Sequence, residues 1–265
     1  MRSALLALAL FLAVPAAAQE RVTYPSADGT AIGALLLRPE GQGPHPAVVL
    51  MHGCGGREDS RGRWMARDAD WARRLAGLGY IVLAPDSFGP RGVRALCTVA
   101  NRPVLPGRQR RADALGARAW LAARADVRAE AIALMGFSNG GSTVLFAADA
   151  PGFAAFVALY PGCRALLSPR AWQPTAPLLL LIGEADDWTP AAPCAELAAK
   201  HAPITFVSYP GAYHGFDGPG SRVQVREGMA LTASGTGRVH VGPDPAARED
   251  ALRRVPAFLA EALGT

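Results

Sequence analysis

The sequence has few charged residues, and almost all of its positive charge is arginine. Of its 265 residues 18% are charged and 50% are hydrophobic, which excludes an intrinsically disordered chain and a coiled coil. Lys200 is the only lysine among 27 basic residues, and the net charge is +5. The arginines are scattered among Ala and Gly and form no basic stripe with aromatic residues. This pattern does not favour nucleic acid as a partner.

Long hydrophobic runs are also lacking. The sequence has no stretch of about 18 apolar residues that would span a bilayer. It begins with Met1 and Arg2, a short apolar run over 5–14, and three small residues at 16–18. This order predicts a cleavable signal peptide over residues 1–18, with a buried N-terminal helix as the alternative. We therefore expect a periplasmic or secreted protein with no membrane span after signal removal.

The expected elements alternate between strand and helix. Apolar runs predict strands at 22–24, 31–37, 46–51, 80–84, 131–135, 153–160, 177–182 and 204–209. Helical spacing of apolar residues predicts helices at 64–78, 108–124, 140–149, 190–201 and 246–263. Continuous apolar strands between helices indicate an α/β fold, with a mostly parallel central sheet covered by helices on both faces. Residues 19–265 are expected to form one domain, with 215–242 as a long loop beside the active face.

One motif indicates covalent chemistry. The strand at 131–135 runs into Gly136-Phe-Ser138-Asn-Gly140, a G-x-S-x-G motif, and then into a helix. Glycines permit a sharp turn that raises the Ser138 hydroxyl above the sheet edge, so Ser138 is the predicted nucleophile. The alternative is a glycine-rich turn in which the serine only caps the helix.

A serine nucleophile needs a base and an acid, which follow it in this fold class in the order acid, then histidine. Asp186 follows the strand that ends near Gly183, and His214 follows the strand at 204–209 in a Gly-flanked loop. We assign them as the acid and the base. Asp187 is the alternative acid and is otherwise expected to cap the next helix. The rival histidines are His45, His52, His201 and His240.

The negative charge of a tetrahedral intermediate requires two N–H donors. One is expected to be the backbone amide of Asn139, which follows the nucleophile. The other is expected from the loop His52-Gly-Cys54-Gly-Gly, an HGGG-type sequence in which Cys54 replaces a glycine. We assign this donor to the Cys54 N–H and expect His52 to be a structural hydrogen-bonding residue.

The chain from about residue 22 to residue 263 resembles an exported branch of the dienelactone hydrolase family of α/β-hydrolases. The resemblance rests on the phrases AVVLMHGCGG, GYIVLAPDSFGPRG, LMGFSNGG, LLLLIGEADDWTP and YPGAYHGF. It implies a Ser or Cys nucleophile with Asp and His, no metal and no organic cofactor. It also implies arginines that hold a substrate carboxylate, for which Arg91 is the candidate; the alternative is a surface arginine.

Two features depart from the family pattern. Members that open dienelactones typically have a Cys nucleophile, where this chain has Ser138. They also have a Glu in the early oxyanion loop, where this chain has the His52–Cys54 sequence. The expected function is a serine hydrolase that cleaves small carboxylic esters or lactones through an acyl-enzyme. The alternatives are a peptidase similar to the prolyl oligopeptidases and a catalytically silent binding protein. The sequence does not indicate the oligomeric state.

The sequence contains four cysteines and no CxxC motif, so it does not support a zinc ribbon or a thioredoxin motif. An even number of cysteines in an oxidising compartment predicts disulfides, and buried free thiols are the alternative. Loops that follow adjacent parallel strands open on the same edge of a sheet, within disulfide reach of each other. We therefore predict the pairs Cys54–Cys97 and Cys163–Cys194.

Overall fold

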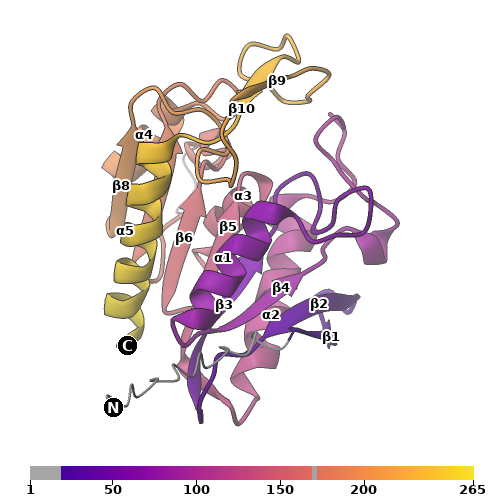
Figure 1. The fold of residues 1–265 in the computed structure, drawn as a ribbon, viewed down its shortest axis with the longest axis vertical. Coiled ribbons are helices and arrows are strands. Elements are labelled where there is room, and N and C mark those ends of the chain that lie inside the picture. Colours follow the sequence, from indigo (N-terminus) through magenta and orange to yellow (C-terminus); the bar gives the residue numbers. More distant parts are fainter. Residues whose placement is uncertain (1–18, 169–171) are drawn as a thin grey trace, which may run out of the picture.

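The computed structural model describes residues 19–168 and 172–265, so the predicted signal peptide lies outside the described residues. An eight-stranded sheet forms the centre of the molecule (Figure 1), in the order β1-β2-β4-β3-β5-β6-β7-β8. The strands are β1 (Gln19–Pro25), β2 (Ala31–Leu37), β3 (His45–Met51), β4 (Ile81–Pro85), β5 (Val127–Phe137), β6 (Ala155–Leu159), β7 (Leu178–Gly183) and β8 (Ile204–Tyr209). Only the β1–β2 and β2–β4 pairs in this sheet are antiparallel. The predicted α/β-hydrolase architecture is confirmed.

Within the described residues, five α-helices cover the two faces of the sheet. They are α1 (Ala66–Gly77), α2 (Arg111–Ala122), α3 (Asn139–Ala147), α4 (Ala191–Lys200) and α5 (Pro245–Leu263). In Figure 1, α1 and α5 lie in front of the sheet, and α2 and α3 lie behind it. Arg248 of α5 donates to Asp70 of α1 at 2.6 Å and fixes the two front helices side by side.

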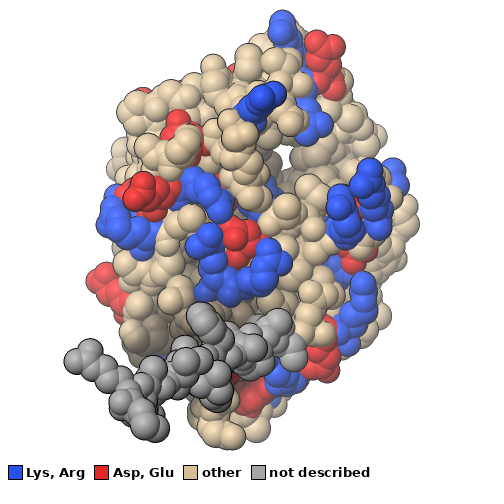
Figure 2. Space-filling view, in the orientation of Figure 1, with Lys and Arg blue, Asp and Glu red and all other residues tan. Residues whose placement is uncertain are grey.

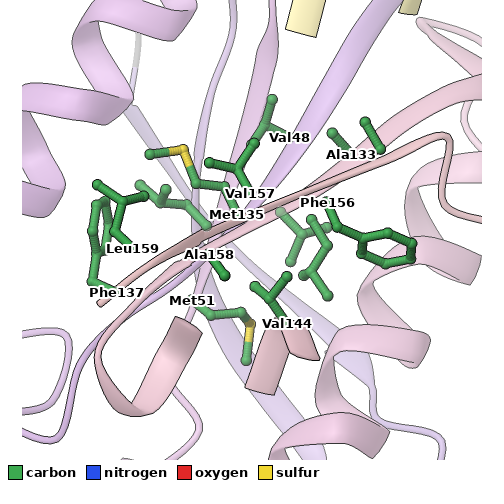
Figure 3. Packing of buried hydrophobic residues seen from close by; sticks show 14 of the residues in the cluster. Val48, Met51, Ala133, Met135, Phe137, Val144, Phe156, Val157, Ala158 and Leu159 are labelled. Atoms are coloured by element: carbon green, nitrogen blue, oxygen red, sulfur yellow. The ribbon is translucent and has the colours of Figure 1, made fainter. Parts of the chain in front are cut away.

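The central strands are buried on both sides, which explains their uninterrupted apolar sequences. Figure 3 shows buried side chains from β3, β5 and β6 on both faces of the sheet, together with Val144 of α3. Val48, Phe137, Phe156 and Leu159 are all fully buried. Removal of each large apolar side chain from water contributes about 1.5–3 kcal/mol to the free energy of unfolding. This core supports the carboxyl-terminal edge of the sheet, where the candidate site is built.

One boundary difference concerns the second expected helix. The sequence predicts a start at residue 108, whereas α2 begins at Arg111 after one wide π turn over Pro106–Arg110. This turn directs the fully buried Arg110 side chain to Asn139 and to the carbonyl of His52. These tertiary contacts at Arg110 account for the departure from regular helical geometry.

Residues 215–242 contain more regular structure than the expected loop. Two short strands, β9 (Gln224–Arg226) and β10 (Val239–Val241), form an antiparallel hairpin above the carboxyl-terminal edge of the sheet (Figure 1). The amide of Gly242 donates to the carbonyl of His214 at 3.0 Å, so the segment leaves and returns at the same place. Asp244 then caps α5 by accepting from the amide of Ala247.

None of the helices within the described residues is long and apolar enough to cross a bilayer. On the face drawn in Figure 2, basic side chains are scattered among acidic and uncharged ones. Several of the arginines form ion pairs with neighbouring acids, such as Arg254 with Asp250 at 2.8 Å.

Candidate active site

Ser138 occupies a sharp turn between β5 and α3. Its backbone has φ 53° and ψ −115°, a strained conformation for a residue other than glycine. A Cβ on Gly140 would lie 2.1 Å from the carbonyl oxygen of Met51, and one on Gly136 would lie 2.4 Å from that of Gly140. Both flanking glycines are therefore required by close backbone packing. The amide of Ser138 donates to the carbonyl of Leu159 at 2.9 Å and anchors the turn to β6.

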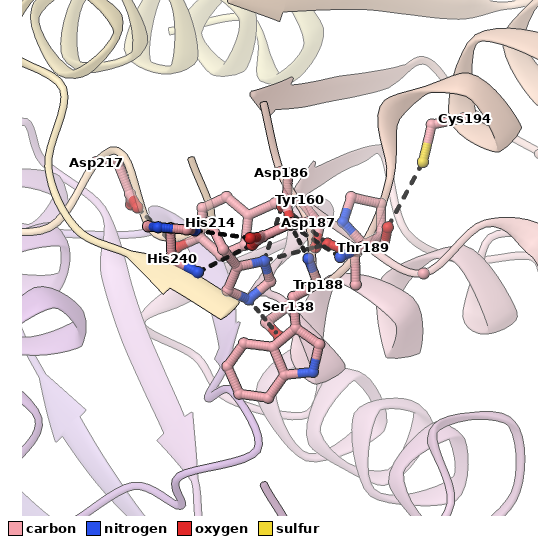
Figure 4. A network of polar contacts seen from close by, with 12 residues as sticks. Ser138, Tyr160, Asp186, Asp187, Trp188, Thr189, Cys194, His214, Asp217 and His240 are labelled. Carbon is pink, nitrogen blue, oxygen red and sulfur yellow. Dashed lines mark hydrogen bonds and ion pairs between the residues drawn. The ribbon is translucent and has the colours of Figure 1, made fainter. Parts of the chain in front are cut away.

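His214 and Asp186 complete a chain of hydrogen bonds with Ser138 (Figure 4). His214 Nε2 lies 2.9 Å from Ser138 Oγ, and His214 Nδ1 lies 2.8 Å from Asp186 Oδ2. The other carboxylate oxygen of Asp186 accepts from the amides of Trp188 and Thr189 at 2.9 and 2.8 Å. All three side chains are buried, with Ser138 only 9% exposed. The arrangement orients the imidazole and leaves Nε2 to share a proton with the serine.

Thr189 and two aromatic rings surround this chain. The Thr189 hydroxyl lies 2.9 Å from Asp186 Oδ2, 3.1 Å from His214 Nδ1 and 3.1 Å from the carbonyl oxygen of Tyr160. The rings of Tyr160 and Trp188 lie 4.7 and 4.9 Å from the imidazole, measured between centroids. They exclude water from the Asp186–His214 contact. Sequence patterns did not reveal Thr189 or Tyr160, because their roles depend on the packing of three loops.

A buried polar cluster lies behind His214. Asp217, three residues after the histidine, accepts from Trp71 Nε1 at 2.7 Å and from the Tyr160 hydroxyl at 2.6 Å. Arg67 donates to the same hydroxyl at 3.0 Å and pairs with the buried Asp68. Burial raises the pKa of Asp68, although its contact with Arg67 opposes this shift. The cluster attaches the His214 turn to α1 and β6.

Asp187 does not cap α4, which has no side-chain cap. Its carboxylate instead accepts from His240 Nδ1 at 2.8 Å and from the His240 amide at 2.9 Å. The ring of His240 stacks on Tyr213 at 4.8 Å. Asp187 and His240 thus form a separate acid–histidine pair that attaches the 215–242 segment, whereas Asp186 contacts His214.

A pocket of about 250 Å³ opens above Ser138, and both Cys54 and Asn139 line it. Among the hydrogen bonds of the described residues, neither the Cys54 amide nor the Asn139 amide donates to a protein acceptor. Both amides are thus available to an oxygen atom bound in the pocket. The buried His52 lies behind them, with Nδ1 2.7 Å from the Gly53 carbonyl and Nε2 accepting from the Ser87 amide at 3.3 Å.

His52 and Arg110 lie close together behind the pocket. Burial lowers the pKa of His52 well below its usual value, and the nearby Arg110 lowers it further. The imidazole is therefore neutral, in keeping with a structural role. Arg110 donates to the Asn139 side chain and, at 2.6 Å, to the His52 carbonyl oxygen, so it joins the two loops that contribute the free amides. Nothing in the sequence distinguishes Arg110 from the other arginines.

Two disulfides brace these loops. Cys54 is bonded to Cys97 with a Cα–Cα distance of 4.9 Å, and Cys163 to Cys194 with 5.1 Å, the pairs expected from the sequence. The first connects the Cys54 loop to the segment after β4. The second connects the segment after β6 to α4.

Arg91 does not line the pocket, which corrects the prediction that it holds a substrate carboxylate. Its guanidinium forms two hydrogen bonds of 2.8 Å to the carboxylate of Asp113 and one of 3.0 Å to Asp28. The Asp113 side chain is fully buried and requires a positive partner, which Arg91 supplies. The residue therefore holds the loop after β4 against α2.

Arg102 is the arginine that lines the Ser138 pocket. Its Nε donates to the Val99 carbonyl at 3.3 Å, and no described Asp or Glu forms an ion pair with it. Burial lowers the pKa of Arg102, because the partly buried guanidinium lacks a neighbouring carboxylate. Its position in a long loop after Cys97 gave no indication in the sequence that it faces the pocket.

Within residues 19–168 and 172–265, no group of three or more His, Cys, Asp or Glu side chains is arranged to hold a metal ion. The site as described consists of protein side chains and backbone amides.

Comparison with known proteins places this site in a family. Residues 32–263 match the dienelactone hydrolase family. A protein of Methylorubrum extorquens named "Putative carboxymethylenebutenolidase" is 31% identical over 214 residues, which cover 74% of this chain and 71% of that protein.

The fold resembles solved structures of more than one activity. The dienelactone hydrolase-like promiscuous phosphotriesterase P91, from metagenomic libraries, superposes with a TM-score of 0.72 at 21% identity, over 94% of this chain and 99% of that one. A puromycin hydrolase superposes with a TM-score of 0.67 at 18% identity, over 96% of this chain and 41% of the other. At these identities the likeness shows the fold alone. With the family match over residues 32–263, it follows that the chain belongs to the dienelactone hydrolase family and is a carboxylic ester hydrolase.

Proposed function

We propose that this chain hydrolyses small carboxylic esters or lactones through a Ser138–His214–Asp186 triad. The observation that carries the proposal is the unbroken hydrogen-bonded chain of 2.9 and 2.8 Å through both nitrogens of His214. A serine hydroxyl becomes a competent nucleophile when a base accepts its proton, and the base must be held in one tautomer by a third group. Each of these requirements has a residue in this site.

In the proposed first step, Ser138 Oγ attacks the ester carbonyl carbon while its proton moves to His214 Nε2. Asp186 accepts the Nδ1–H bond and stabilises the imidazolium that forms. The carbonyl oxygen becomes an oxyanion, and we assign the amides of Cys54 and Asn139, which line the pocket with Ser138, as the donors that hold it. His214 then gives its proton to the leaving alcohol, and an acyl-enzyme remains on Ser138.

The second step repeats this chemistry with water. His214 removes a proton from the water that attacks the acyl-enzyme, and the proton returns to Ser138 when the acid is released. With a lactone, the leaving alcohol stays attached to the acyl group, so the product is a single hydroxy acid.

We further propose that Arg102 binds an acidic group of the substrate. It is the one arginine among the residues that line the pocket with Ser138, and no described carboxylate neutralises it. Arginine binds a carboxylate through two parallel N–H bonds, and partial burial strengthens such a pair. The name of the Methylorubrum relative also refers to a lactone that carries a carboxymethylene group. The test is Arg102→Met, which should raise KM more for a carboxylated ester than for its methyl ester.

The central test is Ser138→Ala with p-nitrophenyl esters, lactones and a peptide amide as substrates. We expect loss of about four orders of magnitude in kcat for esters and lactones in a folded protein. Wild type should also react covalently with a fluorophosphonate, and the variant should not. A variant that keeps about a tenth of the activity would exclude Ser138 as the nucleophile. Preferential cleavage of the peptide amide would favour a peptidase, and failure to react with the probe would favour a binding protein.

We propose that the chain is exported with a signal peptide over residues 1–18 and acts in the periplasm or outside the cell as one domain over 19–265. Both disulfides are compatible with an oxidising compartment. The N-terminal sequence of the protein recovered from a periplasmic or culture fraction tests this: it should begin at Gln19.

A further inference from the structure

A second cavity opens beside the pocket that contains Ser138. It has a volume of about 540 Å³, compared with about 250 Å³ for the Ser138 pocket. The two cavities share Gly162, Trp188, Thr189 and Leu231 in their walls, so they lie side by side. Ligand pockets in proteins commonly enclose about 300–1,000 Å³. The Ser138 pocket alone falls below this range, whereas the two cavities together lie within it.

The wall of the second cavity is almost free of charge. Apart from the shared residues and the exposed Arg164, its lining consists of Cys163, Ala165, Pro190, Pro193, Thr232 and Ala233. Cys163 is held in its disulfide with Cys194 and is not a free thiol. Such a lining offers little hydrogen bonding and favours an apolar group. The lone arginine of the Ser138 pocket, Arg102, is not among its residues.

Leu231 lines both cavities and has an unusual backbone conformation. Its φ of 59° lies in the left-handed region, which leucine rarely adopts. Its side chain is nevertheless 61% exposed, so burial in a core does not offset the strain. Strain of this kind persists where the surroundings fix the backbone, and it is concentrated at sites that bind ligands.

Three hydrogen bonds fix the backbone around Leu231. The Ala230 amide donates to the Cys97 carbonyl at 2.8 Å, and the Ala230 carbonyl accepts from Trp188 Nε1 at 3.0 Å. The Ala233 amide donates to the Asp187 carbonyl at 3.2 Å. These bonds hold the backbone on either side of Leu231 against Asp187, Trp188 and Cys97.

We propose that the second cavity is a substrate subsite that takes an apolar chain of the ester, with Leu231 as the residue that selects for it. The inference rests on the proposed ester hydrolysis at Ser138. A substrate with its scissile carbonyl at Ser138 would extend its apolar chain past Leu231 and Trp188 into the larger cavity. Removal of this chain from water supplies binding energy of about 0.8 kcal/mol per methylene.

The test compares two series of esters. In one, p-nitrophenyl esters carry acyl chains from acetate to octanoate; in the other, alkyl acetates carry alcohol chains from methyl to hexyl. For wild type we expect kcat/KM to rise with chain length in one series. Ala233→Phe narrows the second cavity and does not touch the Ser138 pocket. We compare kcat/KM for the longest ester with kcat/KM for the shortest ester of the series that shows the rise. Ala233→Phe should lower this long-chain to short-chain ratio about tenfold, mainly through KM.

Two further variants complete the design. Leu231→Ala should also lower the ratio, since it removes apolar surface that the chain contacts as it enters the second cavity, and it serves if Ala233→Phe does not fold. Ala192→Phe places the same bulk on an exposed alanine of α4 outside both cavities, and its ratio should equal that of wild type. A flat chain-length profile in wild type, or ratios unchanged in Ala233→Phe and Leu231→Ala, would overturn the subsite. Hydrolysis of p-nitrophenyl acetate and fluorophosphonate labelling, each compared between wild type and Ser138→Ala, separately report whether Ser138 is the nucleophile.

Discussion

At the scale of single residues, adjacent positions in this chain have different partners. Asp186 contacts His214, and its neighbour Asp187 contacts His240, both at 2.8 Å. The difference arises because side chains of adjacent residues diverge in the loop after β7. One pair is buried beneath Trp188 and the other is about one-third exposed. Burial strengthens an electrostatic contact, so the two carboxylates should differ sharply in their effect on rate.

Exchange of each carboxylate for its amide separates the two roles. Asp186→Asn should lower kcat by about four orders of magnitude, since it favours the wrong imidazole tautomer. Asp187→Asn should leave kcat for p-nitrophenyl acetate within about threefold of the wild-type value. It should lower the free energy of unfolding by about 1 kcal/mol or less, as the loss of an exposed ion pair does. Ester hydrolysis and urea unfolding of both variants measure this. An inactive Asp187→Asn enzyme beside an active Asp186→Asn enzyme would reverse the assignment.

His52 gives a prediction for stability against pH. Burial depresses the pKa of His52 in the folded state, so below pH of about 6.5 the unfolded chain binds a proton that the folded chain does not. The free energy of unfolding should therefore fall with decreasing pH in this range, by up to about 1.4 kcal/mol per pH unit. His52→Asn lacks the titrating group and should show a shallower decline between pH 7 and 5. Parallel slopes in urea unfolding of the two proteins would contradict this.

At the scale of elements, the strands and the turns between them were the most predictable part. Apolar runs such as 178–182 are local signals that predict the strands of the sheet, and the strand at 178–182 is present as β7. The G-x-S-x-G motif is a local signal too, and Ser138 lies at the predicted turn between a strand and a helix. Contacts between distant loops were not predictable. Arg91 pairs with Asp113 and does not line the pocket. Arg110 donates to Asn139, which is 29 positions away in the sequence. Both contacts depend on where α2 packs in the folded protein, which no local pattern in the sequence indicates.

The close crossing of α3 over the end of β3 gives a prediction for Gly140, with Gly77 in α1 as the control. Gly140→Ala would place a methyl group 2.1 Å from the Met51 carbonyl oxygen, so either strand or helix must shift. We expect a cost of at least about 3 kcal/mol and loss of esterase activity. Gly77→Ala, at the end of α1, meets no atom within 4 Å and should stabilise the protein by about 0.5–1 kcal/mol. Equal melting temperatures for the two variants would contradict the close packing.

At the scale of the whole molecule, covalent links and hydrogen bonds converge on the same edge of the sheet. The Cys54–Cys97 and Cys163–Cys194 disulfides span 43 and 31 residues of chain and leave the opposite edge unlinked. Closing loops of this length is worth about 2–4 kcal/mol each. Cys97 also accepts the hydrogen bond that positions Ala230, next to the wall of both cavities.

Removal of each disulfide should therefore have a distinct effect. Cys54→Ala with Cys97→Ala should lower both the melting temperature and kcat/KM, because Cys54 lines the Ser138 pocket and Cys97 supports the 215–242 segment. Cys163→Ala with Cys194→Ala should lower mainly the melting temperature. Reductant added to wild type should reproduce both effects and leave the fourfold Ala variant unchanged. Four free thiols in non-reducing peptide maps of the native protein would refute both pairings.

The closed path of the 215–242 segment lets its sequence change without moving the sheet. Gly242 bonds back to His214, and Asp244 bonds back to Phe216, so everything between Asp217 and Val241 is an appendage whose two roots are already joined. Lengthening, shortening or exchanging such an appendage changes loop-closure entropy only slowly and leaves the sheet in place. Yet the appendage contributes Leu231 to the wall of the site. A change within this one short stretch of sequence can thus reshape the wall beside Ser138 while Ser138, His214 and Asp186, which lie outside it, keep their positions.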